Sequence, residues 1–107
     1  MNGLELTTVL NVDDNEARRY AKSRILKRGG YQVLESETGA EALRVVKEFQ
    51  PSLVLLDIKL PDTTGFAVCE AIKADPATAH IMVLQISACT LARRIALLAW
   101  SAALTRI

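Results

Sequence analysis

Four oxygen-bearing side chains in this chain of 107 residues lie at or just past the ends of apolar runs. Asp13 and Asp14 follow the first run, Asp57 follows a later one, and Ser87 follows the last. Carboxylate and hydroxyl oxygens suit a hard divalent cation such as Mg²⁺, which takes one or two carboxylates and keeps several waters. A bound cation would offset the carboxylate repulsion and leave Asp57 anionic and able to attack a phosphorus atom. The set therefore predicts metal-assisted phosphoryl transfer, with Ser87 donating a hydrogen bond to the phosphoryl group.

Each of these residues taken alone is most commonly a turn or cap residue, so the chemistry depends on elements that bring them together. In an open parallel sheet, ligands lie outside the carboxyl ends of the strands. The run before Asp57 is continuously apolar, which is typical of a strand covered on both faces. Apolar runs predict four strands, at Thr8–Val12, Tyr31–Leu34, Leu53–Leu56 and Ile81–Ile86.

Helix-periodic segments lie between these predicted strands, at Glu16–Arg28, Thr38–Phe49 and Gly65–Ala74. Asn15 is a good N-cap for the first helix, and two glycines follow its end, where glycine takes the terminal conformation without a steric clash. Three strand–helix units and a fourth strand, joined by right-handed crossovers, predict an α/β fold in one domain. We expect a doubly wound parallel sheet with three layers, αβα.

Helical spacing also predicts which side chains face the core. In the first helix the predicted inner face is Ala17, Tyr20, Ala21 and Ile25. Basic residues point elsewhere and favour a solvated face over a docking surface for an acidic partner: Arg18, Arg19, Lys22, Arg24, Lys27 and Arg28. The predicted inner faces of the later helices include Phe49, Phe66 and Cys69, and His80 is expected in a loop.

Composition excludes several classes of protein. Half of the residues are hydrophobic and 23% are charged, with a mean hydropathy of +0.20, so the chain is too apolar to be disordered. The apolar runs are too short to span a bilayer, and a net charge of +1 gives no whole-chain case for nucleic acid or an anionic membrane. Cys69 and Cys89 are too few for a disulfide framework, and the N-terminus does not resemble a signal peptide, so we expect a cytoplasmic protein with free thiols.

Together these motifs resemble the receiver domain of two-component response regulators. The resemblance covers roughly residues 8 to 88, and its specificity comes from three motifs in the family's order. The motifs are VLNVDD at 9–14, LVLLDIKLPD at 53–62 followed by Gly65 and Phe66, and VLQISA at 83–88. The resemblance implies a flavodoxin-like arrangement of the predicted sheet.

The resemblance also implies roles for individual residues. Asp57 would be the phosphoacceptor, and Mg²⁺ would be held by Asp13, Asp14, Asp57 and the backbone carbonyl of Lys59. Ser87 would contact the phosphoryl group and take part in a conformational switch. The donor would be a phosphohistidine on a histidine kinase or histidine phosphotransfer protein. Such a domain is a signalling switch that modifies itself, not a turnover enzyme.

The C-terminal end departs from the family pattern, in which a fifth strand ending in a Lys-Pro pair and a fifth helix follow. Residues 89–107 contain no lysine and no proline, so we expect that strand and helix to be missing. Arg106 is a candidate surrogate for the family's lysine, and one hypothesis is that the tail is translated from a shifted reading frame. A sheet without its usual edge favours self-association, so we expect a homodimer or a swapped assembly.

Two other functions are considered beside the phosphorelay. The absent lysine favours a degenerate receiver that acts as a protein-binding module without phosphorylation-dependent switching. A metal-dependent phosphohydrolase with Asp57 as its nucleophile would need a second carboxylate two residues later, and Lys59 stands there. The enzyme interpretation is therefore disfavoured, whereas the binding module stays open.

Overall fold

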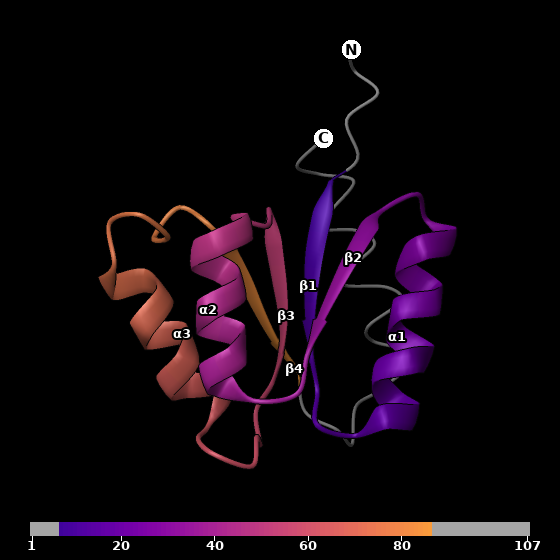
Figure 1. The fold of residues 1–107 in the computed structure, drawn as a ribbon, viewed down its shortest axis with the longest axis horizontal. Coiled ribbons are helices and arrows are strands. Elements are labelled where there is room, and N and C mark those ends of the chain that lie inside the picture. The colour runs from indigo at the N-terminus through magenta and orange to yellow at the C-terminus, as the bar shows by residue number, and fades with distance from the viewer. Residues whose placement is uncertain (1–6, 87–107) are drawn as a thin grey trace.

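The computed structural model of the chain describes residues 7–86, in which strands and helices alternate. All neighbouring strands are parallel, and their order in the sheet is β2-β1-β3-β4 (Figure 1). The elements are β1 (Thr8–Val12), α1 (Glu16–Arg28), β2 (Gln32–Ser36), α2 (Gly39–Phe49), β3 (Leu53–Asp57), α3 (Gly65–Ala74) and β4 (Met82–Ile86).

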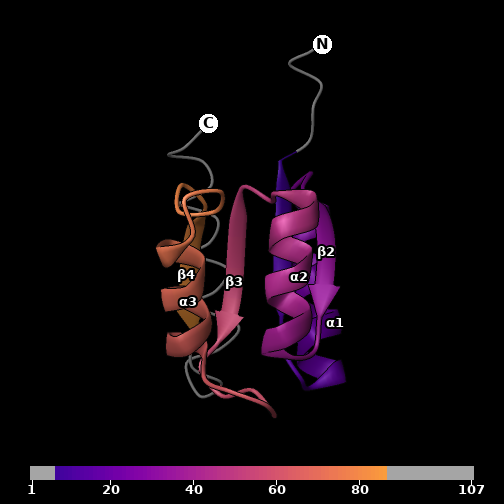
Figure 2. The same cartoon turned by 60° about the vertical axis from the view of Figure 1, so that its left-hand side comes forward.

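The helices cover both faces of the sheet, which makes three layers. Helix α1 lies on one face, and α2 and α3 lie side by side on the other (Figures 1 and 2). Two apolar clusters fill the spaces between the layers. One contains Leu10, Val54 and residues of α2 and α3, and the other contains Val9, Leu55 and Leu26 near the end of α1. The predicted doubly wound αβα fold is thus confirmed for the described residues.

Strand β3 lies at the centre of the sheet between β1 and β4, and all five of its residues are buried. In register, Val12 pairs with Leu56, and Asp57 pairs with Ile86. Because the strands are parallel, the residues that follow them emerge at one edge of the sheet. This register brings Asp13, which directly follows β1, beside the last residue of β3.

Polar side chains fix the start of each helix. Asn15, Thr38 and Thr64 have extended backbones, and each accepts a hydrogen bond from a backbone amide three residues later. Such caps satisfy amides that have no partner within the helix. The predicted bounds of the first and third helices match the structure, and the second helix begins one residue after its predicted start, with Thr38 as its cap.

The second and fourth strands begin one residue later than predicted. Strand β2 starts at Gln32 because the amide of Tyr31 still bonds to the carbonyl of Leu26 and completes the turn after α1. It also runs on to Ser36, whose partner is Val12 of β1. In β4 the amide of Ile81 bonds to Thr78, so pairing with β3 starts at Met82.

The predicted inner face of α1 is wrong. The buried residues of this helix are Lys22, Ser23 and Leu26, whereas Tyr20 is 61% exposed. The helix is rotated because Lys22 forms an ion pair with buried Asp13 and Ser23 bonds to the side chain of Asn11. Hydrophobic spacing misled the prediction because a paired lysine can occupy a buried position that an unpaired lysine cannot.

Two aromatic side chains that were predicted to point inward are exposed, and both lie at helix ends. Phe49 is the last residue of α2 and is 54% exposed; Phe66 is the second residue of α3 and is 61% exposed. Phe66 lies off the stripe that Val68 and Ile72 bury in the core. Cys69 packs partly against that core, and His80 lies exposed in a turn, as predicted. Among residues 7–86 no helix combines the length and apolar character needed to cross a membrane.

Candidate functional site

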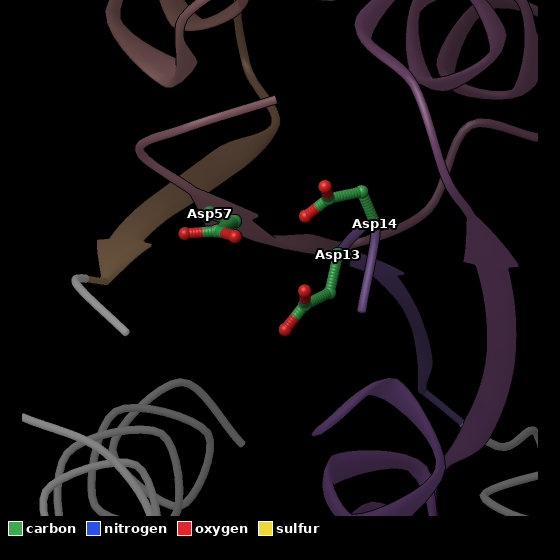
Figure 3. A group of neighbouring side chains, drawn as sticks. All are labelled: Asp13, Asp14 and Asp57. Atoms are coloured by element: carbon green, nitrogen blue, oxygen red, sulfur yellow. The ribbon is translucent and has the colours of Figure 1, made fainter. Parts of the chain in front are cut away.

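Three carboxylates meet where β1 and β3 end, as Figure 3 shows. Asp13 and Asp14 come from the loop after β1, and Asp57 is the last residue of β3. One oxygen from each carboxylate lies within 4.8 Å of the others. Asp13 and Asp57 are buried and Asp14 is exposed, so the cluster opens to solvent on the Asp14 side. The structure therefore brings together the three carboxylates that sequence reasoning singled out.

Of two further predicted site residues, the structure describes Lys59 but not Ser87. Lys59 is exposed and follows β3 in a loop, where it forms an isolated antiparallel bridge with Thr64. The loop thus starts beside Asp57 and folds back before α3 begins. Ser87 and the candidate surrogate Arg106 lie outside residues 7–86, as does the whole of the predicted divergent tail. Their roles stay predictions.

Two cations from α1 reach into the carboxylate cluster. Arg18 donates from Nε and Nη2 to the two oxygens of Asp13, at 3.2 and 3.1 Å, and its Nη2 lies 3.5 Å from Asp57 Oδ2 and 3.9 Å from Asp14 Oδ1. Lys22 Nζ lies 2.9 Å from Asp13 Oδ2, with only 5% of its side chain exposed. These contacts give Asp13 two positive partners and Asp57 one.

Neither cation was predicted at the site, because the helical pattern places both on a solvated face. That assignment is wrong for Lys22, for Arg18 and for Arg19, whose side chain is 12% exposed and pairs with Glu35, whereas the remaining basic residues of the set, Arg24, Lys27 and Arg28, are exposed as expected. A signal was present in the sequence. Arg18 and Lys22 are four residues apart and so share one face of the helix, and Asp14 stands four residues before Arg18.

The electrostatic environment shifts the pKa values of the two buried carboxyl groups in opposite directions. Burial acts to raise the pKa of Asp13, but hydrogen bonds from Arg18, the Asn15 amide and Lys22 outweigh it and lower that pKa. The pKa of Asp57 is raised, first by burial and then by the charge of Asp13, against the opposing influence of the Lys59 amide and the two cations. Asp13 is therefore the anchored carboxylate, and Asp57 is the one whose charge is least compensated.

A network of polar side chains holds α1 against the sheet behind the site. Asn11 of β1 donates to Ser23 Oγ at 3.0 Å and to the carbonyl of Arg19 at 2.9 Å. Ser23 donates in turn to Glu35 of β2, which also pairs with Arg19 at 3.3 Å. Arg19 Nη1 donates to the Asp13 carbonyl at 2.9 Å. These bonds set the rotation of α1 that directs Arg18 and Lys22 to the carboxylates.

Gly65 lets the loop after β3 fold back closely onto its own start. Its amide donates to the Ile58 carbonyl at 2.7 Å, and a Cβ at this position would lie 2.5 Å from the Asp57 carbonyl oxygen. Only glycine fits such an approach to backbone. The same loop is tied to α2, because Asp62 accepts hydrogen bonds from the amides of Gly39 at 2.9 Å and Ala40 at 3.0 Å. These amides lower the pKa of Asp62.

The three carboxylates fit a small divalent cation. Mg²⁺ binds oxygen at about 2.0–2.1 Å, so its ligand oxygens lie up to about 4 Å apart. One oxygen from each of Asp13, Asp14 and Asp57 lies within 4.8 Å of the others, which is close to that spacing. Because all three donors are hard oxygens and one side is open to water, the set suits Mg²⁺ better than a soft transition metal.

Comparisons with known proteins agree on one family. Residues 9–100 match the model of the response regulator receiver domain, so the match runs past Ala88, where the motif resemblance ends. The polar-differentiation response regulator DivK of Brucella ovis is 33% identical over 81 residues, which span 76% of this chain and 66% of that protein.

Solved structures show the same fold. The N-terminal domain of a response regulator receiver protein from Methanoculleus marisnigri is 40% identical with a TM-score of 0.73, over 76% of this chain and 66% of that one. A chemotaxis response regulator of Vibrio cholerae is 27% identical with a TM-score of 0.73, over 76% of this chain and 68% of that one. The aligned segment thus spans about two thirds of each of these relatives.

Proposed function

The chain belongs to the response regulator receiver domain family, and from that premise we propose that Asp57 accepts a phosphoryl group from a phosphohistidine partner in the presence of Mg²⁺. One observation carries the proposal. Asp57 is a buried carboxylate at the end of the central strand, with two further carboxylates within 4.8 Å of it. Its pKa is raised by burial and by Asp13, which marks it as the carboxylate whose charge a bound cation would offset.

The metal ligands in this proposal are the carboxylates of Asp13, Asp14 and Asp57 and the backbone carbonyl of Lys59. Mg²⁺ would supply positive charge to the oxygens of the incoming phosphoryl group. Asp13 is held in place by Arg18, Lys22 and the Asn15 amide, so its oxygens keep one position while Asp57 reacts. Ser87 follows the strand that pairs with β3 and is the proposed hydrogen-bond donor to the phosphoryl group.

The proposed transfer exchanges one bond for another. A carboxylate oxygen of Asp57 attacks the phosphorus, and the P–O bond forms as the P–N bond to the donor histidine breaks. The imidazole nitrogen keeps the electron pair of the broken bond and takes a proton from water. Asp57 then carries a dianionic phosphoryl group where it had a single charge, and this change shifts the population of conformations.

Intact-mass measurement tests the proposal. We expect incubation with Mg²⁺ and a small acyl phosphate to add the mass of one phosphoryl group to the wild type and none to Asp57→Asn. Asp75→Asn is the matched control, because Asp75 ends α3 away from the site, and it should be phosphorylated as well as the wild type. If no adduct forms when Mg²⁺ is left out of the incubation, the result would support the metal requirement.

A folded wild type that stays unmodified under these conditions would contradict the phosphoacceptor role. That outcome would instead favour the degenerate receiver, a protein-binding module that does not switch on phosphorylation. Transfer from a purified histidine kinase or phosphotransfer protein, measured with the same Asp57→Asn control, then tests the proposed class of donor.

A further inference from the structure

Arg18 holds the place beside the three carboxylates that a metal ion would take. Its Nη2 atom lies 3.1 Å from Asp13, 3.5 Å from Asp57 and 3.9 Å from Asp14. A single nitrogen is thus within ion-pair distance of all three carboxylates, and no other cation among residues 7–86 has this arrangement. Lys22 contacts only Asp13.

The two cations differ in their freedom to move. The side chain of Lys22 is 5% exposed, so leaving Asp13 would place an unpaired ammonium in the protein interior, which is strongly unfavourable. The side chain of Arg18 is 29% exposed, so its guanidinium can turn toward water while its stem stays on the helix. Arg18 is therefore the cation that can leave the cluster.

We propose that Arg18 is a built-in counter-ion of the carboxylate cluster that competes with the divalent cation for the site. In the metal-free protein its fork offsets the repulsion among the three carboxylates. When the divalent cation binds, the guanidinium withdraws from Asp57 and Asp14, because a second cation at that position would be repelled by the metal. Arg18 thereby weakens metal binding. This inference rests on the proposed metal site.

Direct titration with Mg²⁺ by calorimetry tests the competition without any phosphoryl donor. We expect Arg18→Gln, which keeps a polar side chain without the charge, to bind Mg²⁺ about tenfold more tightly than the wild type, or about 1.4 kcal/mol. Arg18→Lys keeps the positive charge without the planar guanidinium, so its Mg²⁺ affinity should lie between those of the wild type and Arg18→Gln. Arg24→Gln is the matched control, because it removes the same charge from an exposed position on the same helix and should leave the affinity within about twofold.

A second measurement reports on the metal-free state. Arg18→Gln should lower the urea midpoint of unfolding in chelator, and saturating Mg²⁺ should remove most of that difference. An Arg18→Gln affinity equal to or weaker than that of the wild type would overturn the competition. Absence of Mg²⁺ binding in every variant would overturn the metal site itself, and the competition with it. If the wild type and Arg18→Gln bind Mg²⁺ equally and Asp57 is phosphorylated normally in both, only the proposed role of Arg18 is contradicted.

Discussion

Lys22 Nζ lies 2.9 Å from Asp13 Oδ2 in an almost fully buried ion pair, with 5% of one side chain and 1% of the other exposed. The pair joins α1 to the end of β1 at the back of the carboxylate cluster. Burying either charge alone would be costly, whereas the two together are tolerated because each is the other's partner. The pair therefore has consequences for both folding and the site.

Lys22→Met should destabilise the protein by about 2–4 kcal/mol at neutral pH, because it leaves buried Asp13 with only Arg18 as a side-chain cation. Urea unfolding measures the difference, and Lys27→Met, on an exposed part of the same helix, should change it little. The pKa of Asp13 is lowered in the folded state, so its ionised form stabilises the fold above its unfolded pKa. That stability is lost as the pH falls through the folded pKa, and the gap between variant and wild type should narrow there.

Asp57→Asn should stabilise the metal-free protein at pH 7, because it removes a buried charge beside Asp13. The pKa of Asp57 is raised in the folded state, so ionisation of this group destabilises the fold as the pH rises. The advantage of Asn should be absent below the unfolded pKa and complete above the folded one. Unfolding in urea across this pH range, with chelator present, measures it. A variant less stable than the wild type at pH 7 would contradict the assignment.

Gly65→Ala should destabilise the protein by about 2–3 kcal/mol, because the new Cβ meets backbone atoms of Asp57 and Ile58 that cannot rotate away. Gly39→Ala is the matched comparison. Its Cβ meets the side-chain methyl groups of Thr63 and Val68, which have more freedom to adjust, so we expect a smaller loss. Thermal unfolding of the two variants shows which substitution destabilises the protein more. Equal losses of stability would argue against the close approach at Gly65.

Asp62→Ala should speed hydrogen exchange at the amides of Gly39 and Ala40, because both lose their acceptor at the start of α2. Exchange measured by NMR resolves these two positions from the rest of the helix. Asp75→Ala, which removes an acceptor from the turn after α3, should leave them unchanged. Unaltered exchange in Asp62→Ala would show that the loop does not secure α2.

Much of the fold could be predicted because its signals are local. The continuous apolar run at Leu53–Leu56 marked the central strand, which extends one residue further to Asp57, and Gly65–Ala74 matched its helix at both ends. The convergence of Asp13 and Asp57 followed from one topological rule, that parallel strands end at the same edge of the sheet. These features need only the order of residues along the chain.

The rotation of α1 could not be predicted in the same way. It depends on Ser23 bonding to Asn11 of β1 and on Lys22 pairing with Asp13 just after β1, and an apolar-periodicity argument assigns both helix residues to solvent. Tyr20 was placed inward by the same argument and is instead mostly exposed. The positive half of the site was missed for this reason, although the four-residue spacing of Arg18 and Lys22 places both on one face of the helix.

The tie between Asp62 and α2 gives the site a second physical connection to the rest of the molecule. Arg18 connects the carboxylates to α1 through charge, which dissolved salt screens at this partly exposed position. Asp62 connects the loop after Asp57 to α2 through hydrogen bonds to backbone amides, whose short range and fixed geometry depend far less on ionic strength. Ionic strength therefore distinguishes the two connections: a rearrangement passed through Arg18 weakens in salt, and one passed through Asp62 persists.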